Sequence, residues 1–303
     1  MINHLRWESI FFLGGGIGLL WSVLWLLLAI DHPSDKLSTS IYLPSEEEIN
    51  YIKSNQDRDG HHSSDVSLAK IFTEPAFLCA VLNHFAYNWG YYIFASWLPT
   101  YLKKKLSFDL ESAGFISVLP YLLMTIIGMP AGYVADKLIS KNIASTLFVR
   151  RMFQMLGTLL PALFLVLLCF IPNLNATSAV AIMICALATT PFTTAGHSSN
   201  FLDLSTKHVS LLFSISNAVA TIPGIVGVYI TGFILNETQN WDIVFLLAAS
   251  IYFVAALSFL FFSKAEKIDF DQTHLLRNIE EQETSLGKSF GGLEESFGYQ
   301  SPK

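Results

Sequence analysis

The segment HFAYNWGYYIFASWLPTYL, which begins at residue 84, carries polar side chains in an otherwise apolar stretch. The positions that recur at intervals of three and four residues are His84, Tyr87 or Asn88, Tyr91 and Ala95. A helix places residues at this spacing on one stripe. Imidazole, amide and phenol groups donate and accept hydrogen bonds, so the stripe could hold a polar solute. His84 could also make a proton-sensitive contact, because imidazole changes its charge near neutral pH.

Two further apolar segments carry polar side chains at helical spacing. The first has Thr189, Thr190, Thr193, Thr194 and His197, and the second has Ser214, Ser216, Asn217 and Thr221. Polar groups are costly in a bilayer, so they normally face the interior of a helix bundle or a water-filled cavity. For any single hydroxyl or amide, a hydrogen bond between packed helices is the alternative. The candidate binding residues are His84, Tyr87, Asn88, Tyr91, Ser216 and Asn217.

The composition is that of a membrane protein. Of the 303 residues, 52% are hydrophobic and 14% are charged, whereas soluble domains carry about 25% charged residues. The net charge of −6 excludes the basic surface that nucleic-acid binding requires. The sequence has no metal-ligand spacing, glycine-rich phosphate loop or nucleophile elbow. We therefore expect no cofactor, no metal, no nucleic-acid partner and no enzymatic activity.

Seven apolar segments approach the length of about 20 residues that a helix needs to cross the hydrocarbon core. Each is expected to be a helix, because a span must satisfy its own backbone hydrogen bonds. We place them at residues 10–30, 76–98, 113–135, 152–171, 177–195, 209–235 and 243–262. For the first segment a signal peptide is the alternative, although its apolar run exceeds the usual length of about 7–15 residues. The predicted fold class is an all-α membrane protein with about seven transmembrane helices.

Shorter signals refine this arrangement. Between the first two spans, Ser45 and Glu48 form a capping box for one short helix in a polar stretch. Prolines in or next to the spans predict breaks of the kind that line transporter sites. They are Pro120, Pro130, Pro191 and Pro223.

The basic residues predict an orientation. Fourteen of the 18 lysines and arginines fall in the connections after the first, third and fifth spans or in the tail. By the positive-inside rule these parts face the cytosol, and the run Lys103–Lys105 lies on the opposite side. Two candidate glycosylation sequons, at Asn175 and Asn236, also fall on that opposite side. An odd number of spans then puts the N-terminus outside, which indicates missing upstream helices or a seven-helix receptor.

Several stretches together resemble one transporter family. They are the opening segment, FISVLPYL from residue 115, GYVADKL from 132, VRRMFQMLG from 149, SNFLDLSTKHVSLLFSISNAVATIPGIVG from 199 and WDIVFLLAASIY from 241. In this order they resemble the anion:cation symporter family of the major facilitator superfamily. The resemblance implies a twelve-helix fold of two six-helix halves that rock around a central site.

The resemblance also implies a division of the chain. Residues 1–30 correspond to the family's helix 6, 31–75 to the cytosolic linker between the halves, and 76–262 to the C-terminal half. Residues 263–303 would be a polar, disordered cytosolic tail. The stretch with Gly132, Asp136 and Lys137 resembles a loop motif that latches the inward-facing gate.

The activity that the resemblance implies is H⁺- or Na⁺-coupled transport of inorganic phosphate or small organic anions, incomplete in this chain. The implied partners are a small anionic solute, the coupling ion, membrane lipid, and the missing N-terminal half or a second copy. The chain would lie in a plastid envelope, a lysosomal or vacuolar membrane, or the plasma membrane. The alternatives are a non-transporting truncated fragment and a seven-helix receptor or scaffold.

Two departures from the family pattern affect the site. Tyr87 stands where vesicular glutamate transporters have an arginine, so this position offers no fixed cation for a carboxylate. The sequence Asn200-Phe201-Leu202-Asp203 lacks a histidine that relatives have. In the family, the absent first half carries the main anion-binding arginine and the acidic residues of proton coupling. No residue of this chain is therefore assigned the coupling role.

Overall fold

The computed structural model describes residues 8–30, 45–55 and 66–270. The chain divides into two compact units, residues 1–62 and 63–303, and each is described by itself. Most of the predicted linker (31–75) and most of the predicted tail (263–303) lie outside the described residues.

The first unit contains two described helices, α1 (Ser9–Leu28) and α2 (Glu46–Asn55). Helix α1 is apolar on every side, and none of its residues is buried. Helix α2 begins where the capping box predicted, because the Glu48 backbone N–H donates to Ser45 Oγ at 3.2 Å. Three glutamates in its first turn and Lys53 in its last turn suit the helix dipole.

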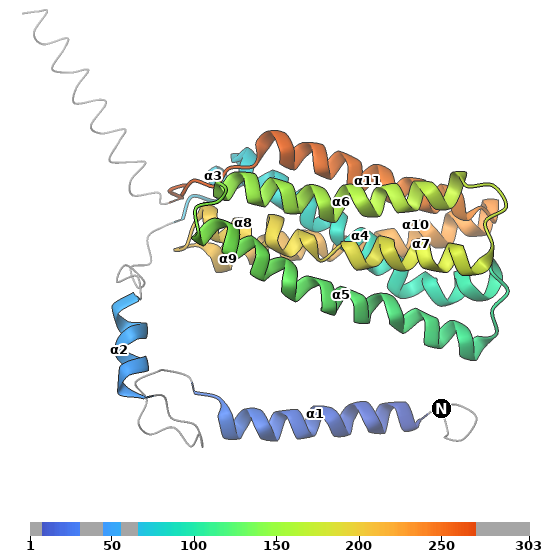
Figure 1. The fold of residues 1–303 in the computed structure, drawn as a ribbon, viewed down its shortest axis with the longest axis horizontal. Helices are drawn as coiled ribbons and strands as arrows, with labels where there is room; N and C mark the ends of the chain where they lie inside the picture. Colours follow the sequence, from blue (N-terminus) through green and yellow to red (C-terminus); the bar gives the residue numbers. More distant parts are fainter. Residues whose placement is uncertain (1–7, 31–44, 56–65, 271–303) are drawn as a thin grey trace, which may run out of the picture. The chain divides into compact units, whose positions relative to one another are not determined.

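The second unit is a bundle of long helices that run side by side (Figure 1). All its regular elements among the described residues are helices, as predicted. They are α3 (Leu68–Thr73), α4 (Pro75–Lys104), α5 (Leu110–Ser140), α6 (Thr146–Phe170), α7 (Ala176–Thr189), the π-helical turn η1 (Thr194–Ser198), α8 (Ser199–Leu204), α9 (Val209–Ala220), α10 (Ile222–Thr238) and α11 (Trp241–Phe262).

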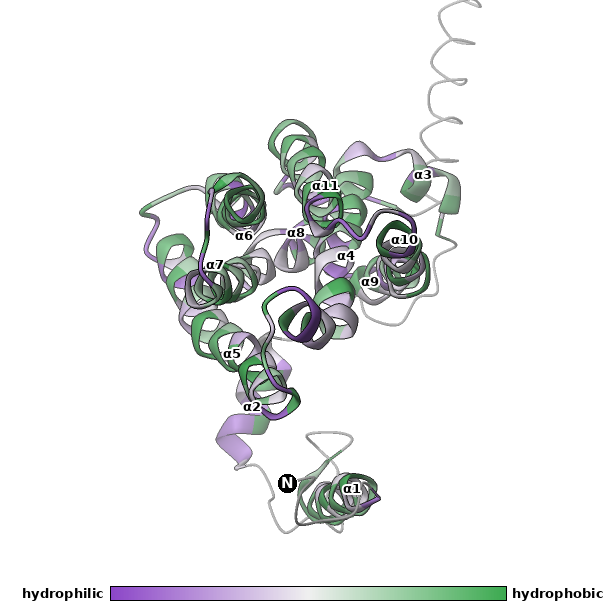
Figure 2. Ribbon diagram, turned by 90° about the vertical axis from the view of Figure 1, so that its right-hand side faces the viewer, coloured by the Kyte–Doolittle hydropathy of each residue, from purple (hydrophilic) through white to green (hydrophobic). Residues whose placement is uncertain are grey.

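Six helical stretches among the described residues are long and apolar enough to cross a membrane. They are Ser9–Leu28, Leu110–Ser140, Thr146–Phe170, Ala176–Leu204, Val209–Thr238 and Trp241–Phe262. The seventh predicted span, α4, is long enough at 30 residues. It is less apolar than the other six, because it carries the polar stripe. The polarity of α4 is tolerated because this helix packs against α5, α9, α10 and α11, and Figure 2 shows it among them.

Several helices extend beyond the predicted spans. Helix α6 begins at Thr146, capped by Ser145 Oγ, so Arg150 and Arg151 lie within a helix. The sequence had assigned both arginines to a connection. The difference arises because a membrane helix continues past the hydrocarbon boundary, where hydropathy no longer marks it.

Two predicted spans are broken in the structure. In the fifth, α7 ends at Thr189, just before Pro191, and the chain continues through η1 into α8; the sixth divides into α9 and α10 before Pro223. Proline has no backbone N–H and disrupts the helical ladder. Pro99, Pro120, Pro130 and Pro161 lie inside helices that continue through them. Proline alone therefore did not determine where a break would fall.

Glycines on α10 receive large aromatic side chains from α4. A Cβ atom added to Gly224 would lie 3.3 Å from the Tyr92 ring, and one added to Gly232 would lie 3.2 Å from the Trp97 indole. Because these glycines have no side chain, α4 and α10 can approach each other closely. This packing places the stripe of α4 beside the break between α9 and α10.

The first residues after α11 are tied to the bundle. Ile268 N–H donates to the Leu204 carbonyl at 2.7 Å, and Ser67 N–H donates to the Phe270 carbonyl at 2.9 Å. Lys264 Nζ lies 2.9 Å from Glu74 Oε1, and this hydrogen-bonded carboxylate raises the pKa of Lys264. Residues 263–270, assigned to the tail by the sequence, therefore pack against the ends of α4 and α8.

Candidate functional site

The polar stripe of α4 meets α9 at a hydrogen bond. His84 Nδ1 lies 2.9 Å from Ser216 Oγ, and both side chains are buried. Ser216 is buried because α9 turns this face toward α4 just before the helix breaks. The structure thus brings together two of the six predicted binding residues, 132 positions apart in sequence.

Aromatic rings extend from this pair along the stripe. The His84 and His197 ring centroids are 5.4 Å apart, and those of Tyr87 and His197 are 6.4 Å apart. Tyr87 stacks on Tyr91 at 6.2 Å, and Tyr91 meets Tyr121 edge to face at 6.0 Å. Tyr87 and Tyr91 are both half-buried. The arrangement is a row of neutral, hydrogen-bonding rings built by α4, α5 and η1.

Asn88 supports the helix break with its amide. Gly224 N–H donates to the Thr221 carbonyl, three residues back, instead of to the Ala220 carbonyl. Asn88 Nδ2 donates to this freed Ala220 carbonyl at 2.7 Å. A buried carbonyl without a partner is costly, so Asn88 stabilises the interrupted segment.

Asn217 lies on a different face of α9 from Ser216. Successive residues of a helix are about 100° apart, and Asn217 is exposed while Ser216 is buried. The sequence predicts both as candidate binding residues. The structure separates their side chains.

His197 is held by a buried chain of amide side chains. Gln154 Oε1 accepts hydrogen bonds from His197 N–H at 2.9 Å and from His197 Nδ1 at 3.1 Å. Gln154 Nε2 donates to Asn83 Oδ1 at 2.7 Å. Asn83 Nδ2 in turn donates to the carbonyls of Cys79 and Ala255, at 2.8 and 2.9 Å. The chain links α4, α6, η1 and α11.

Backbone carbonyls fix the direction of every bond in this chain. A carbonyl only accepts, so Asn83 must present its nitrogen to Cys79 and Ala255 and its oxygen to Gln154. Gln154 must then present its nitrogen to Asn83 and its oxygen to His197. Nδ1 of His197 therefore carries a proton, and in the neutral ring Nε2 holds the lone pair.

Gly196 allows Gln154 to approach the kink at η1. Its backbone has φ −86° and ψ −109°, outside the helical region. A Cβ atom at this position would overlap Gln154 Oε1. The amide network and the kink thus depend on the same glycine.

Most of the threonines and serines named as a hydrogen-bonding face bond to their own helix. Thr190, Thr193 and Thr221 donate to carbonyls three residues back, and Ser214 donates to one four residues back. These hydroxyls bond within their own helical segment, which is neither a solute contact nor the predicted bond between packed helices. Hydropathy and spacing cannot distinguish such a hydroxyl from one that faces a solute.

Near the N-terminus of α6, Arg150 forms a largely buried ion pair with Asp203. Its Nε and Nη2 atoms lie 2.7 and 3.2 Å from the two oxygens of Asp203, and Nη1 donates to the Ala195 carbonyl at 3.2 Å. Bidentate contacts of this kind are strong and directional. The pair fixes α6 to both sides of the kink at Gly196.

The predicted gating motif lies near the C-terminus of α5. Asp136 and Lys137 are exposed, and Lys137 Nζ lies 5.4 Å from the Tyr133 ring centroid. Gly132 has open space beside it. In the described part of the chain, the ion pairs at this end of the bundle join Arg150 to Asp203 and Lys264 to Glu74, and neither involves Asp136.

Both sequons lie on exposed residues. Asn175 is the N-cap of α7, and its Oδ1 accepts from Ser178 N–H at 2.8 Å. Asn236 lies in the last turns of α10. The described residues include no group of three or more His, Cys, Asp or Glu side chains that could hold a metal.

Sequence reasoning missed Asn83 and Gln154 and did not pair Arg150 with Asp203. Asn83 immediately precedes the stripe, and Gln154 is an amide in an apolar span. The cost of a buried amide was a signal for both positions. Their partners on other helices, however, are 43 or more positions away.

Comparison with known proteins gives consistent matches. A family model described as Major Facilitator Superfamily matches residues 1–149. Sialin of Homo sapiens is 35% identical over 265 residues, which cover 87% of this chain and 52% of that protein. The chloroplastic sodium-dependent phosphate transport protein 1 of Arabidopsis thaliana is 32% identical over 268 residues, which cover 88% of this chain and 50% of that protein. The chain spans about half the length of the curated relatives it matches.

A solved structure shares the fold. It is the crystal structure of the peptide transporter POT, a mutant in complex with sulfate, with a TM-score of 0.50 and 18% identity. The match covers 73% of this chain and 44% of that one.

Proposed function

The chain belongs to the anion:cation symporter family of the major facilitator superfamily, and we propose that it works as part of a secondary transporter for inorganic phosphate or small organic anions. It is an integral, multi-pass membrane protein. The printed name of the Arabidopsis relative specifies sodium-dependent phosphate transport. In the proposal the described bundle of residues 76–262 is the C-terminal half, residues 1–30 supply the preceding helix, and 31–75 connect the two.

The observation that carries this proposal is the buried contact of His84 with Ser216 beside His197. It lies where α4 passes two interrupted spans, the η1 kink and the break between α9 and α10. Secondary transporters typically hold solutes at interrupted helices with freed backbone groups. Tyr87 and Tyr91 extend the same surface with phenol groups.

The proposed solute contacts are neutral. His84, Tyr87, Tyr91 and Ser216 would bind oxygen atoms of the anion through hydrogen bonds, and no lysine or arginine belongs to this group. The charge of the anion would therefore be balanced by the N-terminal half or by the co-transported H⁺ or Na⁺. Asn88 would contribute to binding indirectly, because it stabilises the break between α9 and α10. Asn217 would contact only a solute that lies on the exposed face of α9.

The proposal also includes the functional unit, the membrane and the orientation of the chain. Transport needs one half to move against another, so the functional unit would include an N-terminal half or a second copy of this chain. The membrane would be a plastid envelope, a lysosomal or vacuolar membrane, or the plasma membrane. The linker and tail would face the cytosol, as the basic residues predict.

Uptake into sealed proteoliposomes tests the function. Labelled phosphate, glutamate and sialic acid are supplied under an H⁺ or Na⁺ gradient, with empty liposomes as the control. We expect uptake of at least one anion when the chain is extended in frame by five upstream helices. We expect none above the control from the 303-residue chain alone. Absence of uptake of all three anions by the extended protein would contradict the proposal.

A further inference from the structure

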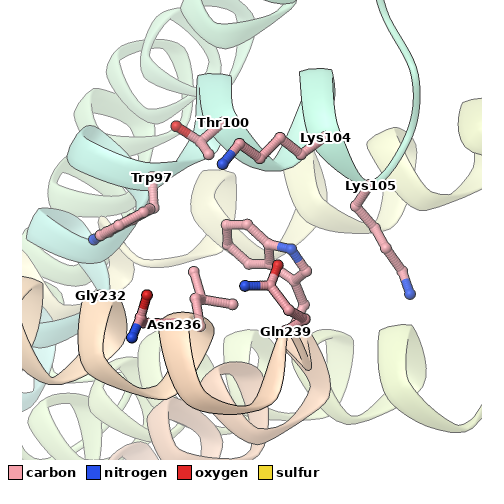
Figure 3. Close-up of a pocket in the computed structure, with 9 residues that line it drawn as sticks. Trp97, Thr100, Lys104, Lys105, Gly232, Asn236 and Gln239 are labelled. Carbon is pink, nitrogen blue, oxygen red and sulfur yellow. The ribbon is translucent and has the colours of Figure 1, made fainter.

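A pocket of about 280 Å³ lies at the end of the bundle where α4 ends and α10 passes into α11. Figure 3 shows its two main walls, one from each helix. The spacing of the lining residues puts them on one face of α4 and one face of α10. They are Trp97, Thr100 and Lys104 on α4, Gly232, Leu235 and Asn236 on α10, and Lys105, Gln239 and Trp241 at the helix ends.

The walls of the pocket are fixed by packing. A Cβ atom on Gly232 would lie 3.2 Å from the Trp97 indole, so this glycine admits the ring. Trp97 meets Trp241 edge to face at 6.4 Å. Gln239 has a left-handed backbone, φ 52°, and its N–H donates to the Leu235 carbonyl at 3.1 Å, which ends α10. The pocket therefore does not depend on a mobile loop.

The pocket presents positive charge and hydrogen-bond donors. None of its nine lining residues is acidic, and within the described residues neither Lys104 nor Lys105 has a carboxylate partner. The nearest acidic side chain on α10, Glu237, accepts from Asn236 Nδ2 at 3.1 Å.

The sequence independently marks the same lysines. The run Lys103–Lys105 is the main exception to the charge asymmetry of the chain, because it lies on the side that the positive-inside rule predicts to be poor in lysine. The central site, in contrast, offers no fixed cation. Two lysines, a hydroxyl and amides around one cavity form a donor set suited to an oxyanion.

We propose that this pocket binds an oxyanion, the phosphate or carboxylate group of a soluble anion or of a lipid headgroup. It shares no residue with the His84–Ser216 site. A test of binding here is therefore separate from the test of transport.

The binding test uses the unglycosylated 303-residue chain in nanodiscs of phosphatidylcholine, so that no glycan at Asn236 fills the pocket. Equilibrium dialysis measures binding of labelled inorganic phosphate. Lys104→Gln and Lys105→Gln, singly and together, remove the lining charges. Lys103→Gln is the matched control, because it removes the same charge from the same run but does not line the pocket. Tyr87→Phe reports on the central site.

We expect the double variant to weaken phosphate binding at least about tenfold, since charge-assisted hydrogen bonds are lost, while K103Q retains it. A second arm uses nanodiscs that contain phosphatidic acid, and native mass spectrometry counts the retained acidic lipid. Retention that depends on Lys104 and Lys105, without phosphate binding, assigns the site to a headgroup.

Phosphate binding or acidic-lipid retention that depends on Lys104 and Lys105 supports the oxyanion site. The proposal is overturned if neither probe binds, or if K103Q weakens binding as much as the variants of the lining lysines. It is equally overturned if Y87F alone abolishes phosphate binding, because the anion would then occupy the central site. Unchanged thermal unfolding of each variant confirms that the fold is intact.

Discussion

The orientation of His197 is set by residues that do not touch the proposed solute surface. Asn83 and Gln154 are buried amides whose hydrogen bonds end on backbone carbonyls of α4 and α11. A network of this kind is costly when one member is missing, because the other members stay buried without partners. Its contribution is therefore to the stability and shape of the site.

Replacing Gln154 by leucine should destabilise the bundle. The change leaves Asn83 Oδ1, His197 Nδ1 and the His197 backbone N–H without their partner, and each such group costs about 1–3 kcal/mol. Thermal unfolding in detergent should show a decrease of several degrees in Tm. Thr158→Val is the control, because buried Thr158 bonds only to a carbonyl of its own helix and should change Tm little. Equal effects of the two variants would contradict the network.

Ser216 and Asn217 form a natural pair for testing the proposed solute surface. Ser216 bonds to His84 and Asn217 points elsewhere, so Ser216→Ala should raise the KM for anion uptake several-fold while Asn217→Ala should not. One hydrogen bond to a neutral group corresponds to about 0.5–1.5 kcal/mol. The measurement is the concentration dependence of uptake by the extended protein. An increase of KM in Asn217→Ala alone would place the solute on the other face of α9.

At the scale of helices, glycines decide how closely α4 packs against its neighbours. Gly90 faces Tyr252 of α11, and a Cβ atom there would overlap the Tyr252 hydroxyl. Tyr252 is almost fully buried and belongs to the main core of the bundle, so it has no space into which it can move.

Gly90→Ala should therefore destabilise the protein by about 1–3 kcal/mol, the usual cost of overpacking a core. Tyr252→Phe should recover part of this loss in the double variant, because it removes the hydroxyl but keeps the ring. Gly114→Ala is the control, since nothing lies within 4 Å of its added Cβ atom, and alanine has the higher helix propensity. Thermal unfolding of the four proteins makes the comparison. A neutral Gly90→Ala would contradict the contact.

At the scale of the molecule, the ends of the bundle differ in their charges and contacts. One end carries Arg150, Asp203 and the segment after α11, tied together by hydrogen bonds. The other end carries the lysines of the pocket. Cysteine labelling distinguishes the two sides of a sealed membrane.

Single cysteines introduced at Lys104 and at Lys141 should react with an impermeant maleimide from opposite sides of the membrane. Exposed Cys185 and half-buried Cys169 are first replaced by serine, whereas Cys79 is buried and can stay. We expect the cysteine at Lys141 to react from the cytosolic side, because the basic residues predict that orientation. Labelling of both positions from one side would contradict a membrane crossing by α5, the helix that lies between them.

The sequence alone determined the class of the protein and the existence of its helices. Long apolar runs have few solutions in a bilayer, because the backbone must bond within its own segment. The short helix behind Ser45 and the contiguous stripe of α4 follow from equally local rules. The position of each helix end was less certain, since polar turns such as the start of α6 extend beyond the apolar run.

Only the tertiary structure decided the partner of each polar side chain. Ser216 and Asn217 are adjacent and similar in the sequence, yet one is buried on His84 and the other is exposed. Asn88, a predicted solute contact, donates its amide to a carbonyl at a helix break. Gln154 and Asn83 join only because α6 packs beside α4. Such choices depend on which helix faces lie together, and that arrangement is set by packing over the whole bundle, so no local pattern of residues contains it.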